Sequence, residues 1–268
     1  MPNEHFVIPP HWEWYILLYF FFAGISGGAF VIGTMLRLWG GPADKAASRL
    51  AFIISFPLLL LCPILLTLDL GWGLTLFGLF SFVMFLGAVG EGGYLRWRVL
   101  AGAGRVMSSI LGIVFMVIGA IFGLFVAAYT GVLLAVSNQP VWSDTWTLGG
   151  LFLASGLSGA AASILLLNRR RRDVAVTDGK LMEADRYFII LELVLIALFL
   201  ITLGGLVSKV LGGGWIILWL IVLIATLVPL VAESRPRMVR QVPPTLVPVL
   251  VLVGVLALRA VIIFSAQA

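Results

Sequence analysis

Long apolar runs separated by short polar connections follow one another along this chain. A helix needs about 20 apolar residues to cross roughly 30 Å of bilayer hydrocarbon at about 1.5 Å per residue. Barrel strands are shorter and alternate in polarity, so the pattern predicts an all-α polytopic bundle. The run over 106–136 is overlong, which predicts a tilted helix or one that ends inside the run. The eight predicted spans are 14–36, 50–70, 72–95, 106–136, 148–167, 187–208, 215–231 and 245–264.

Basic residues indicate how these spans are oriented. The connections after the first, third, fifth and seventh spans hold all but two of the 17 Lys and Arg residues, the exceptions being Lys209 and Arg259. Cytoplasmic loops are enriched in these residues, so this side is predicted to face the cytoplasm. Because the number of spans is even, both termini are then periplasmic. Tryptophans at the opposite, outer boundary are predicted to be interface anchors: Trp12, Trp14, Trp142, Trp146 and Trp215.

Composition excludes several classes of protein. The 268 residues are 62% hydrophobic and 11% charged, with a mean hydropathy of +1.15. A typical globular domain is about half apolar and about a quarter charged. A soluble enzyme and a disordered protein are therefore excluded, and the lipid bilayer is the expected surrounding. The net charge of +5 reflects membrane topology, so no nucleic acid is expected as a partner.

The polar connections leave no room for a soluble catalytic domain. The longest, Asn168–Arg186, suffices for a hairpin or a short helix. Met1–His11 lacks the basic start of a signal peptide, so the first span is expected to remain a membrane helix. A single cysteine, Cys62, permits no internal disulfide and is expected to be a small buried apolar residue. A periplasmic partner docked over the outer loops is expected.

Charged residues inside predicted spans are candidates for function because charge is costly in a bilayer. Asp69 lies at the outer end of the second span, and Arg259 in the outer half of the eighth. We expect these two to be neighbours, either as a proton relay tuned by the arginine or as a structural tie. Glu91 and Glu192 lie on the cytoplasmic side of spans 3 and 6. A proton path through them is one reading; hydrogen bonds that pack the helices are favoured, because a long apolar gap separates them from Asp69.

Three tyrosines near the outer side could donate hydrogen bonds. Tyr15 and Tyr19 are four residues apart and share one face of the first span, and Tyr129 lies near the outer end of the fourth. Small residues beside them predict close helix packing: Gly24, Gly27, Gly28, Gly119, Gly123 and Gly131.

Missing motifs narrow the chemistry. The only histidines, His5 and His11, precede the first span, which excludes haem ligation by two transmembrane histidines. The sequence has no CxxC, iron–sulfur spacing or P-loop. Metal centres of any redox reaction would therefore belong to a partner, and this chain would offer a site for a lipid-soluble carrier such as a quinone.

Several stretches resemble the NrfD/polysulfide-reductase family of membrane subunits. The block from Ala128-Tyr129-Thr130-Gly131 to Pro140-Val141-Trp142 is the most specific, and Thr67–Gly71 resembles the family's DLG element. Further stretches that match are 24–28, 76–82 and 258–267. The resemblance runs along the whole chain.

This resemblance implies two four-helix bundles in a bacterial or archaeal cytoplasmic (inner) membrane. It implies menaquinone or ubiquinone bound near the outer surface, no haem, and a periplasmic iron–sulfur subunit, often with a molybdopterin catalytic subunit beyond it. Tyr129 matches a quinone-contacting tyrosine of the family. Tyr19 and Tyr15 stand where a polysulfide-reductase relative has histidine and asparagine, although a tyrosine can still donate to a carbonyl.

The sequence also departs from the family pattern after Gly71, where Trp72 follows at once. Relatives carry a few dozen outer residues there, which were either lost in this lineage or omitted from the chain. The sequence thus predicts a quinone-binding anchor subunit of a respiratory oxidoreductase. Two alternatives stay open: a secondary transporter or channel, and a structural scaffold for redox partners.

Overall fold

The computed structural model describes residues 14–65, 72–93, 102, 104, 107, 109–137, 139–168, 175–234, 243 and 245–267. These residues are helical almost throughout, and no strand occurs among them. The long helices are α1 (Trp14–Trp39), α2 (Lys45–Leu65), α3 (Trp72–Gly92), α5 (Ile110–Ala135), α6 (Leu148–Asn168), α7 (Ala175–Thr202), α9 (Trp215–Ser234) and α10 (Leu246–Gln267). Short elements are η1 (Pro42–Asp44), η2 (Gly204–Leu206) and α8 (Val207–Leu211).

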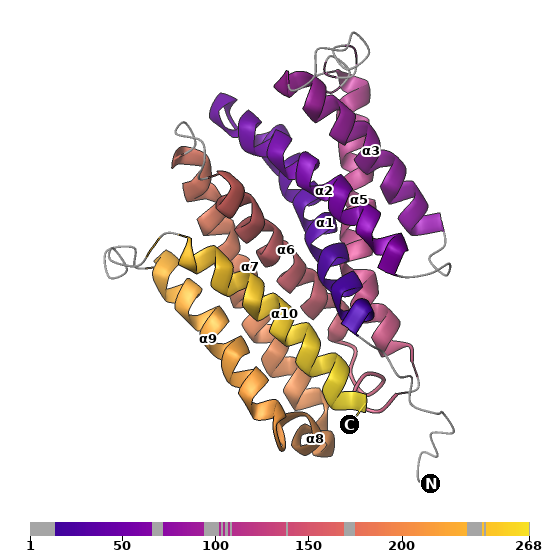
Figure 1. Cartoon of the computed structure of the whole chain (residues 1–268), viewed down its shortest axis with the longest axis vertical. Coiled ribbons are helices and arrows are strands. Elements are labelled where there is room, and N and C mark those ends of the chain that lie inside the picture. Colours follow the sequence, from indigo (N-terminus) through magenta and orange to yellow (C-terminus); the bar gives the residue numbers. More distant parts are fainter. Residues whose placement is uncertain are drawn as a thin grey trace.

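The long helices pack as two groups of four. Helices α1, α2, α3 and α5 form one group, and α6, α7, α9 and α10 form the other (Figure 1). The groups meet where α1 packs against α6 and α10 and where α5 packs against α6. Helix α1 contacts helices of both groups more extensively than the other long helices do. Its side chains therefore lie at the centre of the protein.

The described helices confirm the predicted membrane bundle. Seven of them are long and apolar enough to span a bilayer, and α7 with its continuation gives an eighth. Helix α1 begins and α10 ends at the same end of the bundle, here called the terminal end, and the opposite end is called the basic end (Figure 1). That the basic end faces the cytoplasm stays a prediction from the positions of Lys and Arg.

The sixth predicted span, 187–208, is wrong at both ends. Helix α7 begins at Ala175, because polar residues of its first turns pack on the rest of the protein: Thr177 Oγ1 donates to Asp44 Oδ1 at 2.7 Å. At its other end the helix stops at Thr202, and the following segment Gly204–Leu211 turns away by 107°. Gly204 has a φ of +54°, a conformation that glycine adopts without strain.

Small residues let α1 approach helices of both groups closely. A Cβ atom on Gly27 would lie 2.3 Å from the carbonyl oxygen of Gly123 on α5, and one on Gly28 would lie 2.7 Å from that of Gly156 on α6. The backbones of α1, α5 and α6 are therefore in direct contact, as small residues at membrane helix interfaces allow.

The connection 136–147 caps the end of α10. Gln139 Nε2 donates to the carbonyl of Ala266 at 2.7 Å, and Trp142 Nε1 donates to that of Ile262 at 2.8 Å. Carbonyls in the last turn of a helix have no partner within it, so such donors stabilise the end. The expectation that Trp142 anchors the bilayer interface is wrong, since its side chain is fully buried. Trp146, which is 75% exposed, fits that expectation.

Candidate functional site

Arg259 lies at the centre of the second group of helices and is fully buried. Its guanidinium donates to Ser155 Oγ at 2.7 Å and to the carbonyls of Phe152 at 3.1 Å and Phe20 at 3.3 Å. Its charge also lies 5.0 Å from the centre of the Phe152 ring. One arginine on α10 thus ties together α1 and α6, which belong to different groups.

Space for this guanidinium comes from Gly24 on α1. A Cβ atom on Gly24 would lie 2.6 Å from Nη2 of Arg259, closer than real Cβ atoms come to other atoms. Gly24 was predicted to allow close helix packing, and the guanidinium beside it explains why this position needs the smallest residue.

Glu192 is the buried acid that interacts electrostatically with Arg259. It lies midway along α7, is 2% exposed, and its carboxyl interacts electrostatically with the guanidinium. Helix α7 begins twelve residues earlier than predicted, so Glu192 lies farther along its helix than expected. Asp69, the expected neighbour of Arg259, lies outside the described residues, so that pairing stays a prediction.

Tyr19 carries the most unusual polar group near the terminal end. Its side chain is fully buried on α1, and its hydroxyl oxygen has no hydrogen-bond partner. Cys62 on α2 and Tyr129 on α5 are close enough to influence it electrostatically. Buried hydroxyls are rarely left without a partner, so this group calls for a ligand or a water molecule. Cys62 itself is buried, as expected, and its thiol faces the carbonyl of Leu58 at 3.5 Å.

The other two predicted tyrosines differ in burial. Tyr129 is half-buried, with its ring 5.3 Å from that of Phe125. Tyr15 is 36% exposed and lies edge-on to Trp14. The structure therefore brings Tyr19 and Tyr129 together and leaves Tyr15 at the rim.

Glu91 forms an ion pair rather than an open acidic site. Its carboxylate accepts from Arg37 Nη1 at 2.9 and 3.0 Å, which joins α3 to the end of α1. These contacts fit the alternative in which Glu91 packs helices together through hydrogen bonds. Glu91 and Glu192 also lie in different helix groups, on α3 and α7.

Comparison with known proteins decides the family. A family profile described as polysulfide reductase, of the NrfD type, matches residues 5–268. The chain belongs to this family. It is also 26% identical to the Protein NrfD of Escherichia coli (strain K12) over 301 aligned positions, which cover 96% of this chain and 95% of that protein.

Membership of the NrfD/polysulfide-reductase family makes this chain a membrane subunit of the kind that works with redox subunits. Its described residues contain no group of three or more His, Cys, Asp or Glu side chains that could hold a metal ion. What they do offer near the terminal end is a buried phenol, a second phenol on a neighbouring helix, and the positive charge of Arg259 on α10, which donates to the carbonyl of Phe20 next to Tyr19. Such a set can hydrogen-bond a carbonyl compound that enters from the bilayer.

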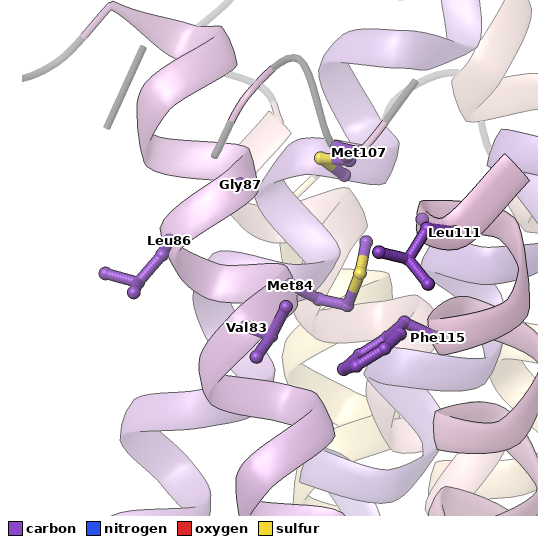
Figure 2. A pocket seen from close by; sticks show the side chains of 8 residues that line it. Val83, Met84, Leu86, Gly87, Met107, Leu111 and Phe115 are labelled. Carbon is purple, nitrogen blue, oxygen red and sulfur yellow. The ribbon is translucent and has the colours of Figure 1, made fainter. Parts of the chain in front are cut away.

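Two apolar cavities lie elsewhere in the bundle. One of about 200 Å³ lies between α3 and α5, where Met84, Leu111 and Phe115 gather at its centre and Leu86 points away (Figure 2). Another, of about 220 Å³, lies between α1 and α7 beside Trp39 and Lys180. The first has no hydrogen-bonding side chain in its lining, so it suits an acyl chain better than a polar ring.

Sequence reasoning placed Glu233 at the end of a span and missed its neighbour at the basic end, Asp185. Asp185 on α7 is 1% exposed and accepts from Ser158 Oγ at 2.6 Å. The carboxyl group of Glu233, at the end of α9, is a close neighbour of the Asp185 carboxyl group. Asp185 fell outside the predicted spans, and only its spacing of seven residues from Glu192 signalled that the two share a helix face.

Proposed function

We propose that this chain is the quinone-reacting membrane anchor of a respiratory oxidoreductase. It lies in the cytoplasmic membrane of a bacterium or archaeon, with the basic end in the cytoplasm. It exchanges electrons with an iron–sulfur subunit docked on the terminal end, and a molybdopterin catalytic subunit lies beyond that subunit. Family membership and the asymmetry of basic residues support this arrangement.

The unpartnered hydroxyl of Tyr19 carries the proposal. A phenol donates one hydrogen bond, and a quinone ring presents two carbonyl acceptors on an otherwise apolar body. Tyr19 is fully buried but has Tyr129 and Cys62 as neighbours on two other helices, so a ring placed there contacts α1, α2 and α5. The residues present therefore fit a quinone headgroup.

Each residue has a defined task in this site. Tyr19 and Tyr129 donate to the carbonyls and orient the ring, and Tyr15 lies at the rim through which it enters. Arg259 holds the turn of α1 beside Tyr19 through the carbonyl of Phe20. Asp69, at the outer end of the second span predicted from sequence, serves as the proton relay. When bound, the quinone supplies the two-electron, two-proton chemistry.

Binding of a quinone analogue to the purified complex tests this proposal. Loss of one neutral hydrogen bond in Tyr19→Phe should weaken binding about 5-fold. Tyr129→Phe should remove most quinol-linked electron transfer while the complex still assembles. Tyr187→Phe is the matched control, because Tyr187 is 58% exposed at the basic end. This variant should bind the analogue as tightly as the unaltered protein does.

The same assay separates the competing functions. A scaffold without a quinone site predicts no saturable binding in any variant. Equal affinities in Tyr19→Phe, Tyr129→Phe and Tyr187→Phe would remove the tyrosines from the site and contradict the proposal.

A further inference from the structure

The groove between α1 and α7 lies at the basic end, where α1 ends and α7 begins (Figure 1). It is the cavity of about 220 Å³ beside Trp39 and Lys180. Helix α1 packs on α6 and α10, and α7 packs on α6 and α9, so the groove separates one helix group from the other. The groups are joined nearby through η1, where Thr177 on α7 donates to Asp44.

Each helix lines the groove with one stripe of side chains. On α7 the stripe consists of Lys180, Ala184 and Phe188, which are four residues apart and share a face. On α1 it extends from Ile32 to Trp39. Both stripes run about 10–12 Å along their helices at about 1.5 Å per residue. The groove therefore leads from the end of the bundle into the hydrocarbon of the bilayer.

Polarity changes along the groove. At its mouth, Lys180 carries an ammonium group and Trp39 is 76% exposed, as tryptophans at the level of lipid headgroups often are. At its deep end, Ile32 and Phe188 offer only apolar surface. A phospholipid has the same order of chemistry, with a phosphate at the membrane surface and acyl chains below it.

The mouth presents positive charge outward. The side chain of Lys180 is 48% exposed, whereas that of its ion-pair partner Asp44 is 1% exposed. Asp44 also accepts from Thr177 Oγ1 and from the backbone N–H of Gly41, both at 2.7 Å, so the lysine is one of three donors to this carboxylate. An ammonium group has three N–H donors, which leaves Lys180 able to bind phosphate oxygens as well.

Other charges near the mouth also favour an anion. Lys45 follows the ion-paired aspartate and is exposed at the start of α2. Two acids on α7 have partners of their own: Glu183 lies 3.9 Å from Arg186, and Asp178 accepts from Asn168 on α6 at 2.8 Å. Among the described residues that line the groove there is no acidic side chain. Basic residues at a membrane surface attract anionic headgroups over zwitterionic ones.

We propose that the groove binds one anionic phospholipid of the surrounding membrane, with its phosphate at Lys180 and Trp39 and an acyl chain between α1 and α7. An apolar groove alone would not select a lipid, because the tails find equally apolar surroundings in the bilayer. The charged mouth supplies the preference. The bound chain joins the two helix groups at the basic end. This site lies at the opposite end from Tyr19 and does not rest on the proposed quinone reaction.

Native mass spectrometry of the full chain in detergent micelles tests the site, with phosphatidylglycerol as the anionic lipid and phosphatidylcholine as the zwitterionic one. The unaltered protein should bind phosphatidylglycerol more tightly. Lys180→Gln should weaken this binding about 5-fold, because one basic residue at the membrane surface contributes about that factor. Lys180→Arg keeps the charge and should keep most of the affinity.

Ala184→Leu tests the groove apart from the charge. Its larger side chain fills the space of the acyl chain and leaves the ion pair of Lys180 in place, so binding of phosphatidylglycerol should be lost. Ala197→Leu is the matched control, since Ala197 is exposed elsewhere on α7. Lys209→Gln is the control for charge, since Lys209 lies near the end of α10, where it donates to Ala266. Both controls should bind as the unaltered protein does.

Thermal unfolding gives a readout that a purely structural lysine would not change. A lipid that binds the folded protein stabilises it. Phosphatidylglycerol should therefore raise the unfolding temperature of the unaltered protein and of both controls, but not that of Ala184→Leu, and the rise should be smaller in Lys180→Gln.

Three results would overturn the lipid site. The first is equal affinity of the unaltered protein for the two lipids. The second is unaltered phosphatidylglycerol binding in folded Lys180→Gln and Ala184→Leu, or an equal loss in Lys209→Gln. The third is a dimer in the spectra that Ala184→Leu abolishes, because a second copy of the chain would then occupy the groove.

Discussion

Gly24 on α1 faces the guanidinium of Arg259 on α10 so closely that a Cβ atom would lie 2.6 Å from Nη2. The guanidinium is held by Ser155 and by two backbone carbonyls, so it cannot retreat without losing hydrogen bonds. Gly24→Ala should therefore destabilise the protein by about 1–3 kcal/mol, the usual cost of overpacking a core. Unfolding by denaturant in detergent micelles measures this change.

Gly150→Ala on α6 is the control for that variant. A Cβ atom at Gly150 would meet only the methyl groups of Leu195 at 3.6 Å, an ordinary contact. Stability should stay equal or rise, because alanine favours a helix more than glycine does. Equal stability losses at both positions would show that the guanidinium does not occupy the space beside Gly24.

Arg259 and Glu192 should behave as an energetically coupled pair. Removal of one charge leaves the other buried without its counter-charge, so Arg259→Met should cost about 3–5 kcal/mol of stability. Adding Glu192→Gln should restore part of that loss, because the remaining acid is then neutral. A double-mutant cycle on the free energy of unfolding measures the coupling, and strictly additive effects would show that the two side chains do not interact.

Trp142 should hold the connection 136–147 onto the end of α10. Trp142→Phe keeps an aromatic ring but loses the hydrogen bond to the carbonyl of Ile262 in a buried setting, which should cost about 1–3 kcal/mol. In the same variant, amide hydrogen exchange in the last turn of α10 should become faster. Trp146→Phe should change neither quantity, since Trp146 is largely exposed; similar effects in both variants would contradict the capping role.

Glu91 should contribute to packing and not to proton movement. Glu91→Gln weakens its charged hydrogen bonds to Arg37, which should cost about 1.5–3 kcal/mol of stability. Unfolding by denaturant in detergent micelles measures this loss, and unchanged stability in Glu91→Gln would contradict the packing role.

Hydropathy alone predicted the bundle, because crossing a bilayer requires long apolar runs whatever their neighbours are. It misplaced both ends of the sixth span for a related reason. The first turns of α7 are polar and are helical through packing on Asp44, while the apolar run 187–208 continues past the bend near Gly204. Tertiary contacts and a positive φ leave no mark on hydropathy.

The candidate site was predictable in part. Charge inside an apolar run singled out Arg259 and Glu192, and both are buried. That the two interact depends on how the helices of the second group are arranged, which one sequence does not encode in its local pattern. Most partners of Arg259 are backbone carbonyls, which no motif reveals. Tyr19 was predicted as a donor, but its lack of a protein partner became visible only in the structure.

Photo-crosslinking with a quinone that carries a reactive group on its ring tests the central claim most directly. The account predicts that peptides containing Tyr19 or Tyr129 are labelled in the full complex and that excess unlabelled quinone prevents this. Labelling that is confined to the apolar cavity between α3 and α5, at residues such as Met84 and Phe115, or that excess quinone does not reduce, would contradict a quinone site at the terminal end.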